Sequence, residues 1–140
     1  RVWYSYAPER SDAVPLVVLL HGSGRNGLSM IEMWREVAEA EGIALLAPDA
    51  LDGTWPRAHP DPAHLSALIE TMSGRHRIDP ERIYLFGHSD GAVYADILLN
   101  RSAGAWRAVA AHAGFASAGY PSSLANPAII ARSSLKVRSP

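Results

Sequence analysis

The 140-residue chain is 48% hydrophobic and 19% charged, a composition typical of one globular domain with a sizeable core. Its 13 basic and 14 acidic residues give a formal net charge of -1, which provides no electrostatic basis for binding nucleic acid or an anionic membrane. The absence of cysteine excludes disulfides, thiolate metal sites and a cysteine nucleophile. No apolar run approaches the roughly 20 residues that span a membrane.

The amino-terminal part predicts two strands. Residues 2–6 are aromatic and β-branched, which favours an edge strand. Residues 14–20 are almost continuously apolar, as expected of a strand that is buried on both faces of a parallel sheet. A glycine-rich loop, residues 21–27, follows at the carboxyl end of this strand.

A first helix is predicted after the loop. Ser29 and Glu32 have the spacing of a capping box, and Gly42 marks the end of the helix. Apolar residues recur at helical spacing, which predicts one buried stripe. The stripe consists of Met30, Met33, Trp34, Val37 and Ala38.

A second strand and helix follow. Residues 43–47 form a short apolar run, and the loop at 49–60 carries Trp55. Asp61 as N-cap and Pro62 at the first helical position predict the next helix start. Its expected core face consists of Leu65, Leu68, Ile69 and Met72.

The segment at 87–91 reads Gly-His-Ser-Asp-Gly, between an apolar run at 82–86 and a dense helical pattern at about 90–100. This arrangement predicts a sharp strand-to-helix turn that exposes the central serine, Ser89, at a helix N-terminus. The backbone is crowded in such a turn, so both of its glycines are expected to be required for steric reasons. A further strand is predicted at 106–111.

Alternating strands and helices predict an α/β fold with a mostly parallel sheet. Ligands bind such sheets at the carboxyl ends of the strands, where the loop at 21–23 and Ser89 both lie. We expect a single domain over 1–140, with a core at 1–114 and an irregular tail at 115–140. A sheet that is incomplete at its carboxyl edge would leave that edge exposed, which would favour a homodimer.

A serine nucleophile requires a base, usually a histidine that a carboxylate orients, and backbone N–H donors for the oxyanion. The N–H of Asp90, directly after Ser89, is one predicted donor. Ser23 is the preferred second donor, with Gly24 as the next choice. The Asp90 side chain is expected to point away from the nucleophile.

The chain resembles the α/β-hydrolase superfamily, and within it the polyhydroxybutyrate depolymerase and feruloyl esterase-like serine esterases, which border on the dienelactone hydrolases. The matching segments are residues 1–8, 15–22, 47–49, 78–84, 87–91 and 108–114. The run at 78–84, Ile-Asp-Pro-Glu-Arg-Ile-Tyr, is more specific than the serine motif alone. The resemblance implies helices on both faces of the sheet and hydrolysis of a small carboxylic ester through an acyl-enzyme on Ser89, without a cofactor.

Five residues near the predicted strand ends are candidate substrate contacts: His21, Gly22, Trp55, His88 and His112. His21 is also suited to brace the glycine-rich loop through a side-chain hydrogen bond, and His88 to pack within the turn. Trp55 is equally suited to anchor its loop. His112 is a candidate to act as the base in place of a triad histidine.

His59 and His64 flank the predicted cap at Asp61, where we expect them to face solvent. No spacing of histidine and carboxylate residues supports a metal site. A chain without cysteine is compatible with both reducing and oxidising compartments. We slightly favour the cytoplasm over secretion.

The sequence after Ser89 does not supply an evident acid and histidine for a complete catalytic triad. In the superfamily the acid and the histidine follow the serine, but only Asp90, Asp96 and His112 follow Ser89. Asp96 falls on a buried helical position. We therefore expect a truncated or frame-altered esterase. The alternatives are a catalytically dead fold that binds or dimerises, and a peptidase or thioesterase of the same fold.

Overall fold

The computed structural model describes residues 1–101 and 106–112, which form one five-stranded sheet and the helices around it. In chain order the elements are β1 (Trp3–Tyr6), β2 (Val14–Leu20), α1 (Gly27–Glu41), β3 (Ala44–Pro48), the 3-10 helix η1 (Leu51–Gly53), α2 (Pro62–Arg75), β4 (Ile78–His88), α3 (Asp90–Asn100) and β5 (Ala108–His112). The predicted tail at 115–140 lies outside the described residues.

The sheet order is β1-β3-β2-β4-β5. Strand β1 runs antiparallel to β3 at one edge, and all other pairs are parallel. The predicted α/β class, the mostly parallel sheet and the edge position of the first strand are therefore confirmed. In the register, Tyr84 of β4 lies between Val17 of β2 and Ala108 of β5.

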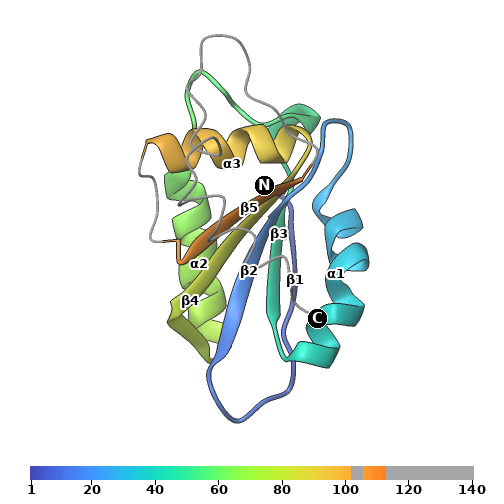
Figure 1. Cartoon of the computed structure of the whole chain (residues 1–140), viewed down its shortest axis with the longest axis vertical. Coiled ribbons are helices and arrows are strands. Elements are labelled where there is room, and N and C mark those ends of the chain that lie inside the picture. Colours follow the sequence, from blue (N-terminus) through green and yellow to red (C-terminus); the bar gives the residue numbers. More distant parts are fainter. Residues whose placement is uncertain (102–105, 113–140) are drawn as a thin grey trace.

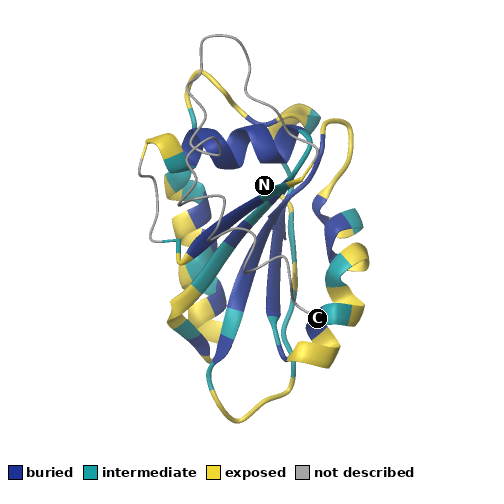
Figure 2. Ribbon diagram, viewed as in Figure 1, coloured by how far each residue is buried: buried dark blue, intermediate teal, exposed yellow. Residues whose placement is uncertain are grey.

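Helices cover both faces of the sheet, α1 on one side and α2 with α3 on the other (Figure 1). Met30, Ile31 and Ala38 of α1 pack with the β2 and β3 side chains that point to their face. Leu65, Leu68 and Met72 of α2 and Tyr94 and Leu98 of α3 pack on the opposite face. Strands β2 and β3 and helix α3 are almost entirely buried, whereas α1 and α2 are exposed on their outer sides (Figure 2).

The chain changes direction in the middle of this sheet. From β2 it passes through α1 to β3 on one side, and from β3 it crosses through α2 to β4 on the other side. The segments after β2 and β4 therefore diverge to opposite faces, and in sheets of this kind the ligand-binding crevice lies at the carboxyl ends of two such strands. The glycine-rich loop and Ser89 follow these two strand ends.

Three local predictions were wrong. Helix α1 begins at Gly27 with Asn26 as N-cap, because the Asn26 side chain accepts the N–H of Ser29 at 3.0 Å. Ser29 is thus the third helical residue and not a cap. Met33 is 55% exposed, and Ile31 takes its place in the buried stripe.

The third correction concerns β4, which begins at Ile78 and not at residue 82. Ile78 pairs with Val14, and the register then shifts before Leu16 meets Ile83. Within this irregularity the Asp79 carboxylate accepts the N–H of Glu81 at 2.9 Å, which forms a tight local bend inside the strand.

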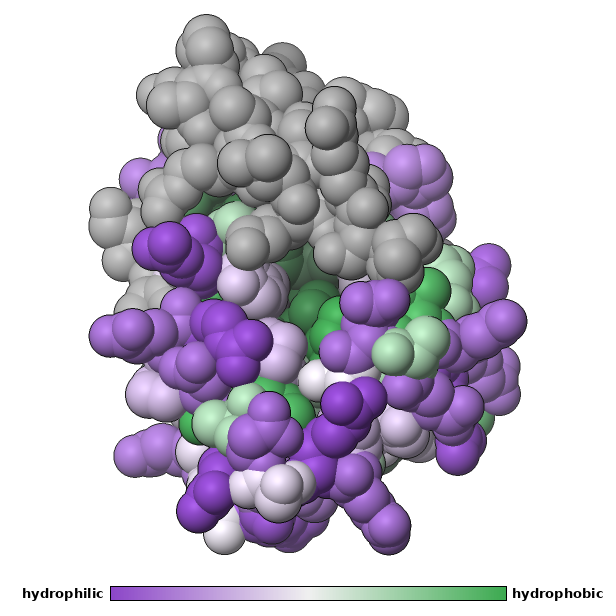
Figure 3. All heavy atoms as spheres, turned by 60° about the horizontal axis from the view of Figure 1, so that its bottom comes forward, coloured by the Kyte–Doolittle hydropathy of each residue, from purple (hydrophilic) through white to green (hydrophobic). Residues whose placement is uncertain are grey.

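An apolar groove of about 230 Å³ runs between α1 and strands β2, β4 and β5. Its aromatic and aliphatic lining includes Val17, Trp34, Ile43, Tyr84 and Phe86. The view in Figure 3 shows hydrophobic patches among a mostly hydrophilic surface of the described residues. None of the described helices has the length and apolar character needed to cross a bilayer.

Candidate active site

The turn between β4 and α3 holds Ser89 in a strained backbone conformation. Its φ of 55° and ψ of -114° lie in a region that non-glycine residues rarely adopt, at a cost of about 1–3 kcal/mol. The two flanking glycines are required because a Cβ on Gly87 would overlap the Gly91 carbonyl, and one on Gly91 would overlap the Leu20 carbonyl. The predicted strand-to-helix turn and its steric demand are present.

Gly22 packs directly against Ser89 and His88. A Cβ added to Gly22 would lie 3.4 Å from Cβ of Ser89 and 3.5 Å from Cδ2 of His88. The Gly22 carbonyl accepts the N–H of Arg25 at 3.1 Å, and Gly24 donates its N–H to the Gly53 carbonyl at 3.1 Å. Since the Gly24 N–H is engaged in this way, Ser23 is the better of the two predicted loop donors.

His21 is completely buried, and both of its ring nitrogens have partners. The Ala50 N–H donates to Nε2 at 2.9 Å, so the ring proton is on Nδ1, which donates to the Gly22 carbonyl at 2.7 Å. These contacts favour the bracing role of His21, and a substrate contact stays a prediction. Its contacts brace the glycine-rich loop, and neither nitrogen is available to act as a base.

Trp55 anchors the loop between β3 and α2. Its side chain is 6% exposed, and the indole Nε1–H donates to the His21 carbonyl at 2.8 Å. The Trp55 ring lies 5.1 Å from the His21 ring and stacks on Tyr94 at 5.2 Å with an interplanar angle of 8°. This burial leaves little of Trp55 for a substrate, so anchoring is the role that the geometry favours.

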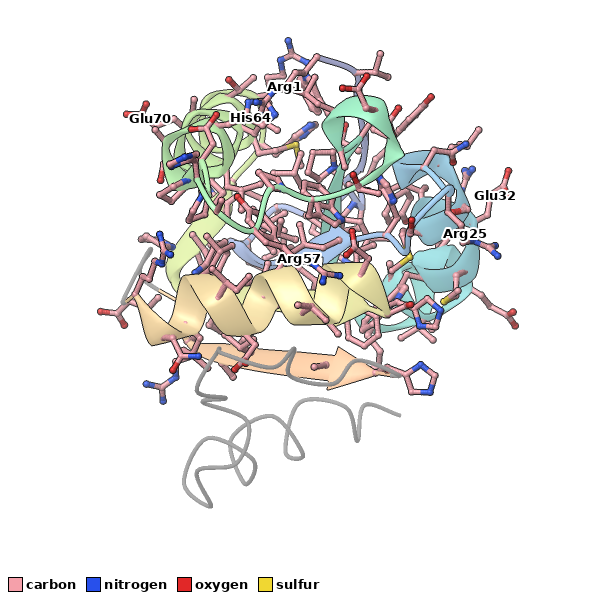
Figure 4. All side chains as sticks on the ribbon, turned by 90° about the horizontal axis from the view of Figure 1, so that it is seen from above. Arg1, Arg25, Glu32, Arg57, His64 and Glu70 are labelled. Atoms are coloured by element: carbon pink, nitrogen blue, oxygen red, sulfur yellow. The ribbon has the colours of Figure 1, made fainter. Side chains whose placement is uncertain are left out.

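The Asp90 side chain contacts the same loop. Its Oδ2 accepts the Trp55 backbone N–H at 2.9 Å, and its Oδ1 pairs with Nη2 of Arg57 at 2.8 Å. Asp90 is 8% exposed, and Arg57 lies against α3 when the molecule is seen from above (Figure 4). The pairing of Arg57 with Asp90 was not predicted from the sequence. A buried acidic residue in the first turn of an apolar helix was the one available signal, because such a charge needs a partner.

His88 and His112 occupy paired positions at the ends of β4 and β5. Their Nδ1 atoms are 3.1 Å apart, and their rings stack with centroids 5.2 Å apart. The Ser89 N–H donates to the His112 carbonyl at 2.8 Å, which connects the Ser89 backbone to β5. His88 is half-buried and His112 is exposed.

The other candidates lie away from the crevice. Asp96 is 4% exposed within α3, as predicted. His64 is partly buried, so the expectation that it faces solvent was wrong, whereas His59 is exposed. Nε2 of His64 has no hydrogen-bond partner among the described residues. Burial, and next the Arg1 charge, lower the pKa of His64, and the Asp61 carboxylate acts in the opposite direction.

A cavity of about 480 Å³ lies between η1, the Trp55 loop and the start of α2. Asp52, His59, Asp61 and His64 contribute polar groups to its wall. No group of three or more histidine, cysteine or acidic residues in the described ranges could hold a metal ion.

The mostly parallel sheet, the helices on both faces and the serine turn at the crevice define the α/β-hydrolase fold. A family model described as "Esterase PHB depolymerase" matches residues 4–138. The chain therefore belongs to the polyhydroxybutyrate depolymerase family of esterases.

Individual relatives agree with this assignment. NocK of Nocardia uniformis subsp. tsuyamanensis is 30% identical over 105 residues, which cover 64% of this chain and 29% of NocK. An acetyl xylan esterase from Aspergillus awamori superposes with a TM-score of 0.70 at 14% identity, over 81% of this chain and 47% of the other. LpqC, a poly(3-hydroxybutyrate) depolymerase from Bordetella parapertussis, superposes with a TM-score of 0.62 at 23% identity, over 77% of this chain and 44% of LpqC.

At these identities the two superpositions show the fold alone. The chain spans 29% of NocK and less than half of either solved structure.

Proposed function

We propose that this chain acts in carboxylic-ester hydrolysis through an acyl-enzyme on Ser89. One observation carries the proposal: a strained serine at the N-terminus of α3 packs against Gly22 of the loop that follows β2. Strain of this kind persists where a fold holds a residue for its chemistry, and the helix N-terminus favours developing negative charge. Membership in an esterase family supports the same reaction.

In the proposed reaction Oγ of Ser89 attacks the acyl carbon and its proton passes to a base. The carbonyl oxygen becomes an oxyanion and accepts hydrogen bonds from the backbone N–H groups of Asp90 and Ser23. The tetrahedral intermediate collapses, the protonated alcohol leaves, and water then hydrolyses the acyl-serine by the same steps. No cofactor is required for this sequence.

None of the described residues is assigned as the general base. His21 is excluded by its two occupied nitrogens, and Nδ1 of His88 is engaged with His112. The test must therefore distinguish a chain that has only the serine nucleophile from a chain that also contains the general base.

We would treat the whole chain with a fluorophosphonate probe, with and without added imidazole, and measure the intact mass beside Ser89→Ala. If the chain contains its own base, we expect Ser89 to be labelled in the absence of imidazole. Loss of this labelling in His112→Gln would identify His112 as the base. Labelling that requires imidazole would mean that the nucleophile is formed and the base is missing. A folded chain that labels under neither condition would contradict the proposal and favour a binding or dimerising module.

The same preparation would be tested on short p-nitrophenyl esters, thioesters and peptides. Turnover of the esters that Ser89→Ala abolishes is the expected outcome. A preference for peptides or thioesters would favour the peptidase or thioesterase alternative, since one scaffold serves many acyl groups.

A further inference from the structure

The Asp90 carboxylate connects α3, which begins at the nucleophile, to a loop that is distant in sequence. It accepts the Trp55 N–H at 2.9 Å and pairs with the Arg57 guanidinium at 2.8 Å. A carboxylate that is 8% exposed is costly to bury unless it is paired, and both of its oxygens have partners here. Hydrogen bonds to an ionised group are roughly twice as strong as neutral ones.

From Trp55 the contacts continue to the other side of the crevice. The indole Nε1–H holds the His21 carbonyl at 2.8 Å, and the His21 ring holds the Gly22 carbonyl at 2.7 Å. The Trp55 ring contacts the His21 ring at a tilt of 43° and stacks on the Tyr94 ring, and these two contacts fix its plane. A continuous series of contacts therefore runs from the residue after the nucleophile to the loop that faces it.

We infer that the Asp90 carboxylate is a positioning residue, which acts through Trp55 and His21 to hold the 22–24 loop in place opposite Ser89. The inference rests on the proposed function, because that loop supplies the second oxyanion donor. Oxyanion donors are effective only when they are fixed in advance, within about 0.5 Å of their productive position. Asp90 would then have two roles in the site. Its N–H would donate to the oxyanion, and its carboxylate would position the 22–24 loop.

The first test measures backbone amide exchange by NMR and requires no activity. Asp90→Ala and Asp90→Asn both keep the Asp90 N–H. The control is Asp79→Ala, since Asp79 also binds one backbone N–H, at 2.9 Å, and one arginine, Arg82 at 2.7 Å. Asp79 lies near the start of β4, at the opposite end of the strand from Ser89.

Asp90→Ala should accelerate exchange at the Trp55 and Gly24 amides at least tenfold. Asp90→Asn should have a smaller effect, because its amide oxygen can still accept the Trp55 N–H. Asp79→Ala should leave both amides unchanged. Equal Gly24 exchange in Asp90→Ala and Asp79→Ala would overturn the inference, whether or not the chain proves to be an esterase.

The second test follows the rate of Ser89 labelling under the condition in which the wild-type chain reacts. Asp90→Ala should lower the limiting rate at saturating probe at least tenfold, while the half-saturating probe concentration changes less than twofold. An unchanged limiting rate would overturn the inference, since a role in stability alone would leave it unchanged. If Asp90→Ala does not fold, Asp90→Asn and Arg57→Gln should each accelerate exchange at the Trp55 and Gly24 amides by the same, smaller factor, and the double variant should show no further acceleration. Additive effects would contradict coupling through one contact.

Discussion

His88 and His112 face each other at the ends of neighbouring strands with their Nδ1 atoms 3.1 Å apart. A hydrogen bond between two imidazole nitrogens requires one protonated and one unprotonated partner. When both rings are neutral, the donor ring therefore carries its proton on Nδ1 and leaves its Nε2 unprotonated. The two rings of the pair therefore differ in which nitrogen carries the proton.

We therefore expect opposite tautomers in the two rings. Long-range ¹H–¹⁵N correlation spectra of the neutral histidines should show Nδ1–H on one of His88 and His112 and Nε2–H on the other. His112→Gln should alter the tautomer balance of His88, whereas His59→Gln should not. The same tautomer in both rings would contradict a hydrogen bond between them.

The crowded backbone of the serine turn predicts a large stability cost for Gly91→Ala. The added Cβ would overlap the Leu20 carbonyl, and overpacking of this kind costs about 1–3 kcal/mol even where side chains can adjust. Gly74 provides the control, because a Cβ there meets nothing within 4 Å and the position lies in α2. Gly74→Ala should stabilise the fold by about 0.5–1 kcal/mol. Urea unfolding followed by circular dichroism measures both, and equal stability of the two variants would refute the steric argument.

The proposed oxyanion donor of Ser23 is its backbone N–H. Substitutions that keep or remove this N–H should therefore differ sharply in the rate of Ser89 labelling. Ser23 is exposed, and Ser23→Ala should leave the rate of Ser89 labelling within about twofold. Ser23→Pro removes the N–H, and losing one oxyanion donor should slow labelling by about 10²–10³-fold. Both melting temperatures should stay close to that of the wild type. Equal labelling of the two variants would exclude Ser23 as a donor and return Gly24 to consideration.

Local spacing was sufficient to predict much of the fold. Pro62 and Asp61 mark the start of α2 because capping depends on residues within one turn, and the Asp61 carboxylate does accept the His64 N–H. Gly87 and Gly91 could be recognised as steric requirements because the turn itself creates the crowding.

The errors arose where competing or distant partners decide the structure. Asn26 and Ser29 both suit an N-cap, and only the path of the preceding loop selects Asn26. The start of β4 depends on Val14, 64 positions away, and the salt bridge of Asp90 depends on Arg57 in a loop of irregular structure. The general base and the predicted homodimer through a sheet edge stay predictions, because partners outside the described residues would decide both.

The partly buried His64 predicts a pH-dependent stability. Because burial lowers its pKa below the unfolded value of 6.5, the folded state favours the neutral ring. The unfolded chain binds the proton more readily, so His64 contributes a loss of stability that develops as the pH falls through 6.5. By NMR the His64 ring should titrate below 6.5, and Asp61→Asn should lower its pKa further, because the Asp61 carboxylate favours the charged ring. His64→Asn should reduce the slope of unfolding free energy against pH below 6.5. A His64 pKa at or above 6.5, or an unchanged slope in His64→Asn, would contradict burial as the dominant influence on this ring.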